Sequence, residues 1–311
     1  MILAVLAFLC VQAPLLEVVW DASTAKPGKL IVIDVTTPPA VAVVSQLSAR
    51  LGDHAGIALP ISSDHRRWRV LVPVDIESKL KPLPLQIDAI LADGRTSTWN
   101  KPVALREGDY DRRTISVGKE FTQPSARQKK RAAAETLVLA SALRMQSPER
   151  LWRGSFTKPT AGLQTSPFGS LRTYNKSRRS RHLGWDLDGD VGAPIVAAGR
   201  GRVLLATPRF YSGGTVLLDH GQGLMTLYFH MARIDVLAGR LVEKGEALGA
   251  VGASGQVTGP HLHFSVRLGG LYVDGRQLIE LNLSADADDR NAAGPPATTP
   301  HTTSAVTPRA P

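Results

Sequence analysis

Histidine and aspartate stand in short segments whose residue types suit metal chemistry. In the first segment, His182 and Asp186 are separated by three residues, with Gly184 midway between them. Imidazole and carboxylate are both good zinc ligands, and a short gap lets a turn or strand end direct both at one point. A glycine suits a tight backbone path between them. Alone, this pattern is weak, because it arises fairly often by chance.

The second segment places two histidines around a leucine and ends on a phenylalanine, as His261, Leu262, His263 and Phe264. Side chains alternate between the faces of a strand, so both histidines are expected on one face and both apolar residues in a core. Two imidazoles on one face favour a functional site. Two solvent-facing histidines on a half-buried strand remain the alternative for this segment alone.

The third segment is Tyr228, Phe229 and His230. The same alternation predicts Tyr228 and His230 on one face of a strand and Phe229 on the other. A single histidine on a strand is usually structural, so this segment indicates a functional site only together with the other two segments.

With these segments in this order, the sequence resembles the lysostaphin and LytM-type zinc endopeptidases of bacterial cell walls. The resemblance covers about residues 154–278. Further matching motifs are GAPIVAA (192–198), GRV (201–203), VLLDHG (216–221), VEKGEALG (242–249), GASG (252–255) and TGPHLHF (258–264). So many matches in the expected order are specific to that family.

The resemblance implies that His182, Asp186 and His263 hold one Zn²⁺ per chain. Three protein ligands leave an open position for water, as catalytic zinc requires. His230 and His261 match the family's two active-site histidines that are not ligands. One would be the general base for zinc-activated water, and the other would stabilise the oxyanion or protonate the leaving amine. Which does which stays open.

Three further residues are candidates for substrate binding. Tyr228 either orients the pocket or packs beneath it. Residues 172–181 carry five basic side chains and are expected to form a loop beside the groove. Within it, Arg178 is a candidate for gripping wall carboxylates, with an ordinary exposed loop as the alternative. Asn175 is expected to reach into the groove. His220 is spaced like the family's turn histidine, and a structural role is favoured for it.

Short strands must position these residues, since the chain reads as mostly β. Residues 15–105 show strands at 30–33, 68–72 and 85–90 and a hairpin turn at Asp93 and Gly94, which favours an immunoglobulin-like β-sandwich. A helix is predicted from Ala126 to Met145, capped by Ser125. Strands and glycine-rich turns, without a helix, are predicted over 152–281, and the resemblance implies an antiparallel β peptidase domain of the LytM type there.

The predicted organisation has five parts. They are a signal peptide at 1–13, the sandwich at 14–108, a linker with the helix at 109–150, the zinc peptidase domain at 151–282 and a disordered tail at 283–311. Residues 1–13 are apolar and too few to span a bilayer, and Val11 and Ala13 suit a cleavage site. No basic residue precedes the apolar run, so a buried N-terminal strand is the alternative, and lipid attachment at Cys10 is a minor one. A signal peptide implies a periplasmic or secreted protein.

The charge and composition of the chain limit the classes of binding partner that are expected. The formal charge of +10 over 311 residues favours binding to polyanions. Nucleic acid is not expected, because no zinc finger, helix-turn-helix or aromatic–basic stacking pattern is present. No other apolar run is long enough for stable membrane insertion, and a monomer is expected.

These features together predict an endopeptidase that hydrolyses peptide cross-links in bacterial peptidoglycan, with its stem peptides as the partner. A catalytically silent scaffold or activator of another wall hydrolase is the alternative, although such relatives typically lack ligands. The cleaved bond stays open between a D-alanyl–diamino acid link and a glycine bridge, with the long chain favouring the former. The N-terminal domain is expected to target substrate, to act as a spacer or to cover the groove.

Overall fold

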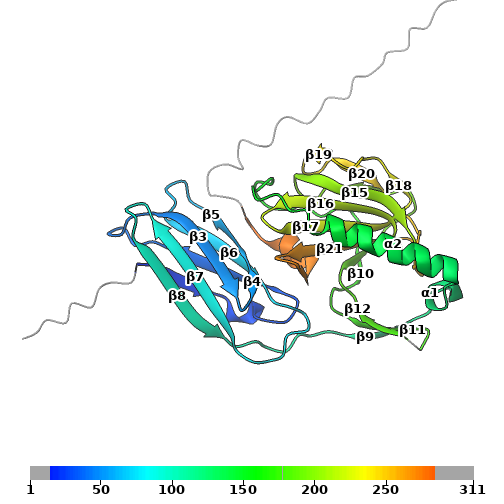
Figure 1. Ribbon diagram of the computed structural model, residues 1–311, viewed down its shortest axis with the longest axis horizontal. Coiled ribbons are helices and arrows are strands. Elements are labelled where there is room, and N and C mark those ends of the chain that lie inside the picture. The colour runs from blue at the N-terminus through cyan, green and yellow to red at the C-terminus, as the bar shows by residue number, and fades with distance from the viewer. Residues whose placement is uncertain (1–14, 177, 284–311) are drawn as a thin grey trace, which may run out of the picture.

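The computed structural model describes residues 15–176 and 178–283, which form two β-rich domains lying side by side (Figure 1). The fold is mostly β, as predicted. The expected signal peptide and residues 284–311 of the expected tail lie outside the described residues. Within the described ranges, no helix is long and apolar enough to cross a membrane.

The N-terminal domain consists of two four-stranded antiparallel sheets. In spatial order, the first holds β1 (Glu17–Trp20), β2 (Leu30–Thr36), β6 (Arg67–Pro73) and β5 (Ile57–Pro60), and a short 3₁₀ helix, η1 (Ala22–Thr24), follows β1. The second holds β4 (His54–Ala55), β3 (Val44–Leu51), β7 (Leu83–Leu91) and β8 (Thr96–Val103).

Alternation along these strands fills the core of this domain. Ile31 and Ile33 of β2 are buried in one apolar cluster with Leu85 and Ile87 of β7. The predicted strands at 30–33, 68–72 and 85–90 and the hairpin turn at 93–94 are confirmed. The more specific immunoglobulin-like assignment stays a prediction.

Three elements connect the domains: β9 (Arg112–Ile115), α1 (Lys119–Thr122) and α2 (Ala126–Ala142). Ser125 and Gln128 form the capping box that starts α2. The helix therefore begins where predicted and ends three residues before Met145. Leu139 and Leu143 pack it against an apolar cluster of the C-terminal sheet.

The C-terminal domain is built on an eight-stranded sheet and two three-stranded sheets. The large sheet runs in the order β10 (Gln164–Ser166), β13 (Trp185–Asp188), β21 (His261–Leu268), β17 (Leu224–Met231), β16 (Gly213–Gly221), β15 (Gly201–Arg209) and β19 (Leu241–Val242), with β22 (Leu271–Val273) paired to β21. The small sheets are β12 (Arg178–Arg181), β11 (Leu171–Tyr174) and β9, and β14 (Pro194–Val196), β20 (Ala247–Ala250) and β18 (Arg233–Ile234).

A short helix, α3 (Gly275–Glu280), corrects the expectation that residues 152–281 contain none. The Asp274 side chain caps it by accepting from the Arg276 N–H. Six residues are too few to show a helical repeat, so the pattern was not visible in the sequence.

Strands β11 and β12 pair as an antiparallel hairpin within this basic segment, which corrects the expectation of a loop. Asn175 and Lys176 turn the chain with positive φ angles of 46° and 59°. The linker supplies β9, which pairs in parallel with the free edge of β11. A segment expected to be a mere connector is thus part of the sheet beside the C-terminal domain (Figure 1).

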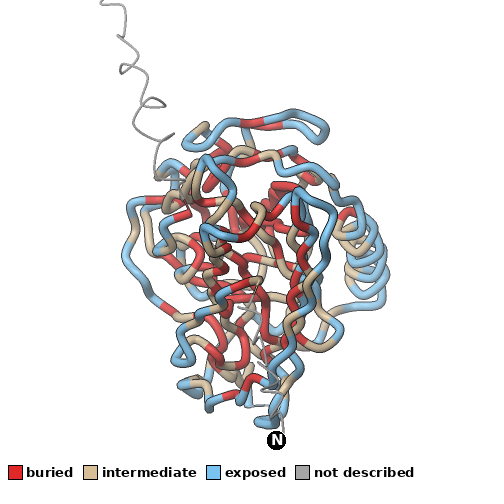
Figure 2. Tube along the Cα trace, turned by 90° about the vertical axis from the view of Figure 1, so that its left-hand side faces the viewer, coloured by how far each residue is buried: buried red, intermediate tan, exposed pale blue. Residues whose placement is uncertain are grey.

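The two domains share buried surface. Leu30, Ile57, Leu59 and Leu71 of the first sheet belong to the same apolar cluster as the core of the C-terminal domain. The Gln277 side chain of α3 accepts from Leu30 N–H and donates to Leu30 O, both at 2.8 Å. Buried segments consequently occupy the interior of the whole molecule (Figure 2).

A buried polar chain crosses the C-terminal core. His220 Nδ1–H donates to Arg200 O at 2.9 Å, and its Nε2 bonds to Thr226 Oγ1 at 2.8 Å. Thr226 in turn bonds to the Tyr228 hydroxyl. Burial lowers the pKa of His220 to about 4, so the ring is neutral at pH 7. This supports the structural role expected for His220.

The chain should therefore lose stability in acid through His220. Its pKa is lower in the folded state than the ordinary 6.5, so the unfolded state binds the proton more readily and stability falls as pH drops from about 6.5 to 4. Relative to His220→Gln, the wild type should lose about 2–3 kcal/mol more unfolding free energy between pH 7 and 4.5. Denaturant titrations of both metal-free proteins measure this, and equal losses would contradict it.

Candidate metal centre

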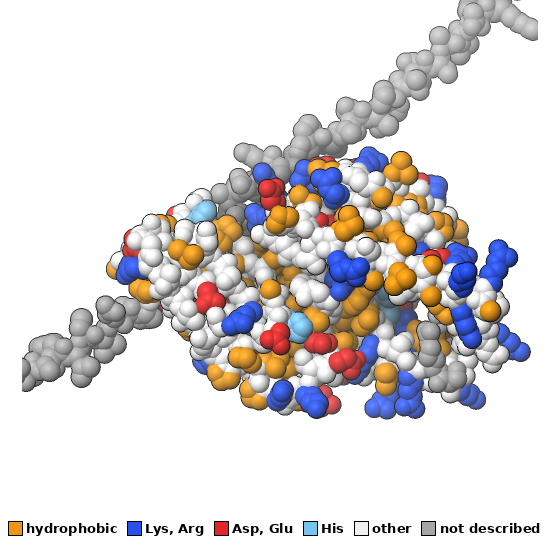
Figure 3. All heavy atoms as spheres, viewed as in Figure 1, with side chains coloured by type: hydrophobic (Ala, Val, Ile, Leu, Met, Phe, Trp, Pro, Cys, Tyr) orange, Lys and Arg blue, Asp and Glu red, His pale blue; other side chains and the backbone are white. Residues whose placement is uncertain are grey.

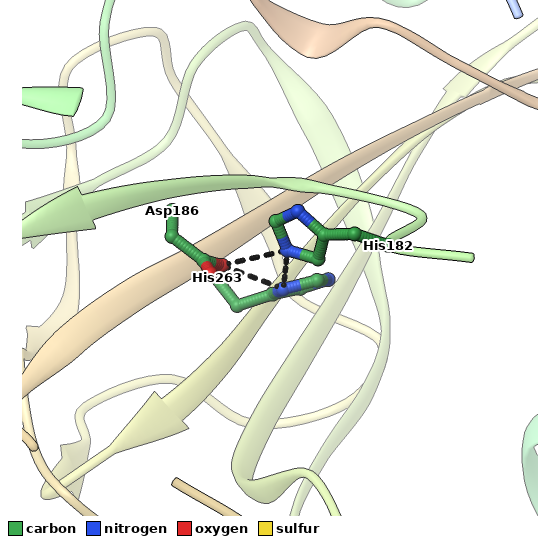
Figure 4. A group of neighbouring side chains, drawn as sticks. All are labelled: His182, Asp186 and His263. Atoms are coloured by element: carbon green, nitrogen blue, oxygen red, sulfur yellow. Dashed lines mark hydrogen bonds and ion pairs between the residues drawn. The ribbon is translucent and has the colours of Figure 1, made fainter. Parts of the chain in front are cut away.

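Three side chains converge at one point in the C-terminal domain (Figure 4). Asp186 on β13 and His263 on β21 are directly paired across the sheet, and His182 follows β12. Asp186 Oδ1 lies 2.9 Å from His182 Nε2 and 2.9 Å from His263 Nδ1. The two nitrogens are 3.0 Å apart. The structure therefore brings together all three predicted ligands.

Outer hydrogen bonds fix the proton on each imidazole. His182 Nδ1–H donates to Pro167 O at 2.7 Å. His263 Nε2–H donates to Ser265 Oγ at 2.9 Å, and that hydroxyl donates onward to Leu183 O at 2.7 Å. A neutral imidazole carries one proton, and in both rings the nitrogen facing away from the cluster uses it. His182 Nε2 and His263 Nδ1 therefore direct lone pairs into the cluster.

The charges of the cluster suit a cation. Burial lowers the pKa of His263 to about 4, so this ring is neutral at pH 7. Asp186 is buried, and its ion pair with the Arg172 guanidinium favours the charged carboxylate. A carboxylate oxygen and two imidazole lone pairs thus face one another without protons between them. Two imidazoles and one carboxylate form a known catalytic zinc set, so these residues fit Zn²⁺.

Arg172 on β11 holds the other oxygen of the carboxylate. Its Nη2 donates to Asp186 Oδ2 at 2.6 Å and to Ser166 Oγ at 2.7 Å. Both ionic partners are almost buried, with side-chain exposures of 11% and 7%. Oδ1 is left for the metal. The sequence placed Arg172 only among five basic residues, and no signal singled it out, because the contact depends on the hairpin.

His230 and His261 flank the three ligands. Their Nδ1–H groups donate to Ser254 O at 2.8 Å and Gly259 O at 2.9 Å, so each ring keeps a lone pair on Nε2. The ring centroids are 4.9 Å apart, and His261 Nε2 lies 3.8 Å from Asp186 Oδ1. Burial lowers the pKa of His230 to about 3, and the nearby His263 and His261 contribute to the same shift. His230 is therefore neutral at pH 7.

Strand alternation predicted β21 correctly but failed on β17. Leu262 and Phe264 are fully buried, as expected. On β17, the pairing with β16 shifts between Tyr228 and Met231, and His230 takes a φ of 65°. Phe229 is the direct partner of His263 in the regular β17–β21 register, and the two rings stack with centroids 5.2 Å apart. The irregularity turns His230 toward the same cluster.

The prediction that Tyr228 contacts substrate is wrong in this structure, because its side chain is fully buried. Its hydroxyl accepts from Ala198 N–H at 2.8 Å, and its ring packs on Phe264. Tyr228 thus lies beneath the site, which corresponds to the packing alternative.

Asn175 does not reach into the groove either. Its side chain turns to the linker, where it accepts from Val117 N–H and donates to Val117 O, both at 2.9 Å. Asn175 therefore ties the hairpin to the segment after β9. Arg178 lies in β12, and its side chain is outside the described part of the structure, so its role in binding stays a prediction.

Comparisons with known proteins agree with this geometry. Residues 180–275 match the model of Peptidase family M23. The peptidoglycan DD-endopeptidase ShyB of Vibrio cholerae is 37% identical over 103 residues, which are 33% of this chain and 24% of ShyB. The DD-carboxypeptidase/endopeptidase Mpg of Neisseria meningitidis is 33% identical over 106 residues, covering 34% of this chain and 24% of Mpg. The match spans about a quarter of each relative.

One solved structure resembles more of the chain. A crystal structure of a peptidase M23 from Pseudomonas aeruginosa superposes with a TM-score of 0.60 at 26% identity, covering 82% of this chain and 95% of that one. Such coverage includes both domains. Residues 180–275 therefore form a peptidase family M23 domain, and the predicted resemblance to lysostaphin and LytM-type peptidases is confirmed.

Gly184 should be required for metal binding. A Cβ there would lie 2.3 Å from His263 Nε2 and 2.8 Å from Ser265 Oγ, so a side chain must displace the ligand or its hydrogen bond. Gly184→Ala should weaken zinc binding at least about tenfold, as losses of outer hydrogen bonds do. Competition with a zinc chelator measures this. Gly189→Ala is the matched control, because its Cβ meets nothing closer than 3.4 Å; equal affinities would contradict the expectation.

Proposed function

We propose that the chain is a zinc-dependent endopeptidase that hydrolyses peptide cross-links in bacterial peptidoglycan. The observation that carries the proposal is the convergence of three inward-facing ligand atoms with the free Nε2 atoms of two further histidines. The names of the relatives, peptidoglycan DD-endopeptidases among them, support a cell-wall hydrolase. His182, Asp186 and His263 would hold one Zn²⁺ per chain.

A bound zinc ion supplies a Lewis acid that polarises the scissile carbonyl and lowers the pKa of water to about 7. The residues around it manage the protons. His230 and His261 are oriented by carbonyls at Nδ1, so each offers Nε2 to accept a proton from the attacking water or, once protonated, to return it to the leaving amine. Arg172 holds the Asp186 carboxylate in orientation by donating to Oδ2.

The charge of the molecule suits an anionic cell wall. Lys and Arg side chains gather at the end of the molecule that carries α1 and α2 (Figure 3). Arg113 and Arg172 line the cavity that contains Asp186, His230 and His261. We infer that stem peptides with free carboxylates are the partner. A wall substrate implies a periplasmic or secreted location, in line with the leader expected at 1–13.

A silent scaffold or activator is less well supported. Silent relatives typically lack a ligand or histidine, whereas all five side chains are present around one point here. The two functions differ in whether the purified chain alone breaks cross-links.

The zinc-loaded chain should release new free amines from cross-linked peptidoglycan and deplete muropeptide dimers, because a zinc-assisted hydrolase needs no second protein. Mass spectrometry of the soluble products measures both, with chelator-treated protein as the control. If a chain carrying stoichiometric zinc released nothing, the enzyme assignment would be abandoned for the scaffold alternative.

The two groups of histidines should respond differently to substitution. His263→Ala should lose both zinc and activity, because it removes a ligand. His230→Ala should keep its zinc and lose activity by about a hundredfold or more, since it removes a group that moves a proton. Metal analysis and initial rates on cross-linked dimers measure the two effects. Comparable zinc loss in both variants would overturn this division of roles.

A further inference from the structure

Two cavities open on either side of the metal cluster. The larger, of about 570 Å³, is lined by Asp186 and His261 together with Arg113 and Ile115 of β9. The smaller, of about 260 Å³, is lined by His182 and His263 together with the aromatic side chains Tyr211, Phe229 and Tyr272. Four residues line both cavities: Arg172, Tyr174, His230 and Gln256. A peptide that occupies both cavities must therefore pass these four side chains.

Two of the shared residues hold buried donors without partners. The Gln256 side-chain nitrogen, Nε2, is buried and has no hydrogen-bond acceptor within the described ranges. The same holds for Arg172 Nε. Buried donors are nearly always paired, and leaving one unpaired is costly. Gln256 as a whole is only half-buried and lines both cavities, so a rotation of its side chain would present Nε2 to an oxygen acceptor of a bound molecule.

The backbone around Gln256 is held rigidly. Gln256 N–H donates to Tyr211 O at 2.8 Å. Two residues earlier, Ser254 Oγ accepts from Gly214 N–H and donates to Met231 O. The carbonyl of the same Ser254 accepts from His230 Nδ1. One turn thus fixes both the histidine ring and the backbone that carries the Gln256 side chain.

We propose that Gln256 is a specificity-determining residue of the peptidase site. Its carboxamide N–H donates to a carbonyl or free carboxylate oxygen of the substrate peptide where the peptide crosses from one cavity to the other. This inference rests on the proposed function and adds to it the group that reads the substrate beside the cleaved bond.

Gln256 is the better residue to test. Arg172 also holds Asp186, so replacing it would disturb the metal ligands. In contrast, none of the hydrogen bonds among the described residues joins the Gln256 side chain to a ligand. Gln256→Leu removes the donor at similar volume, and Gln256→Glu replaces it with an anionic acceptor. Gln46→Leu, at an exposed position of β3, is the matched control.

The test uses the zinc-loaded full chain and two soluble cross-linked peptide dimers. The dimers differ only in whether the diamino acid at the scissile bond carries a free carboxylate or a carboxamide. Gln256→Leu should raise KM about tenfold, with zinc content and kcat close to wild type and a melting temperature no lower than that of the wild type. A rise in KM on both dimers identifies a main-chain carbonyl as the acceptor. A rise in KM on the carboxylate dimer alone identifies the free carboxylate. Gln256→Glu should bind the carboxylate dimer more weakly still.

Wild-type KM values for both Gln256 variants on both dimers would overturn the inference while leaving the peptidase assignment intact. A fall in kcat alone would overturn it as well, because the donor would then not act in binding. If wild-type protein cleaved neither dimer nor peptidoglycan, the proposed function itself would fail, and the inference would fall with it.

Discussion

The shared carboxylate of Asp186 is the interaction on which the rest of the site depends. One oxygen faces two imidazole nitrogens, and the other is held by Arg172. Buried charges are tolerable only when they are paired and hydrogen-bonded, so this carboxylate requires the hairpin, the β13–β21 pair and the turn at His182 to meet at one place.

Much of the fold and the ligand set could be predicted from the sequence. The strands of the N-terminal domain, the start of α2 and the burial of Leu262 and Phe264 follow from alternation and capping, which are local signals. The ligand candidates came from motif order. Their convergence follows from the register that pairs Asp186 with His263, which is set by the sheet and not by either segment alone.

What the sequence did not reveal depends on contacts between distant segments. The local sequence does not indicate the irregular pairing of Phe229 and His230 with β16. Non-glycine residues rarely adopt a positive φ, and this one depends on how β17 pairs with that neighbouring strand. Arg172 gains its partner only when residues 171–181 fold back as a hairpin. The sequence predicts Asn175 as a groove residue. Its actual partner, Val117, lies in the linker about sixty residues earlier, so no local signal could indicate this contact.

The strand β9 changes what counts as the working unit of this protein. The family match begins at residue 180, yet one wall of the larger cavity is built from residues 113–117. Exchange of the matched segment between relatives would carry over the candidate metal ligands but leave behind part of the cavity wall beside them. Under the proposed function, variation in the interdomain segment would change which peptides are accepted while the candidate metal ligands stay the same, so chimeras joined upstream of residue 112 are the ones that preserve a whole groove.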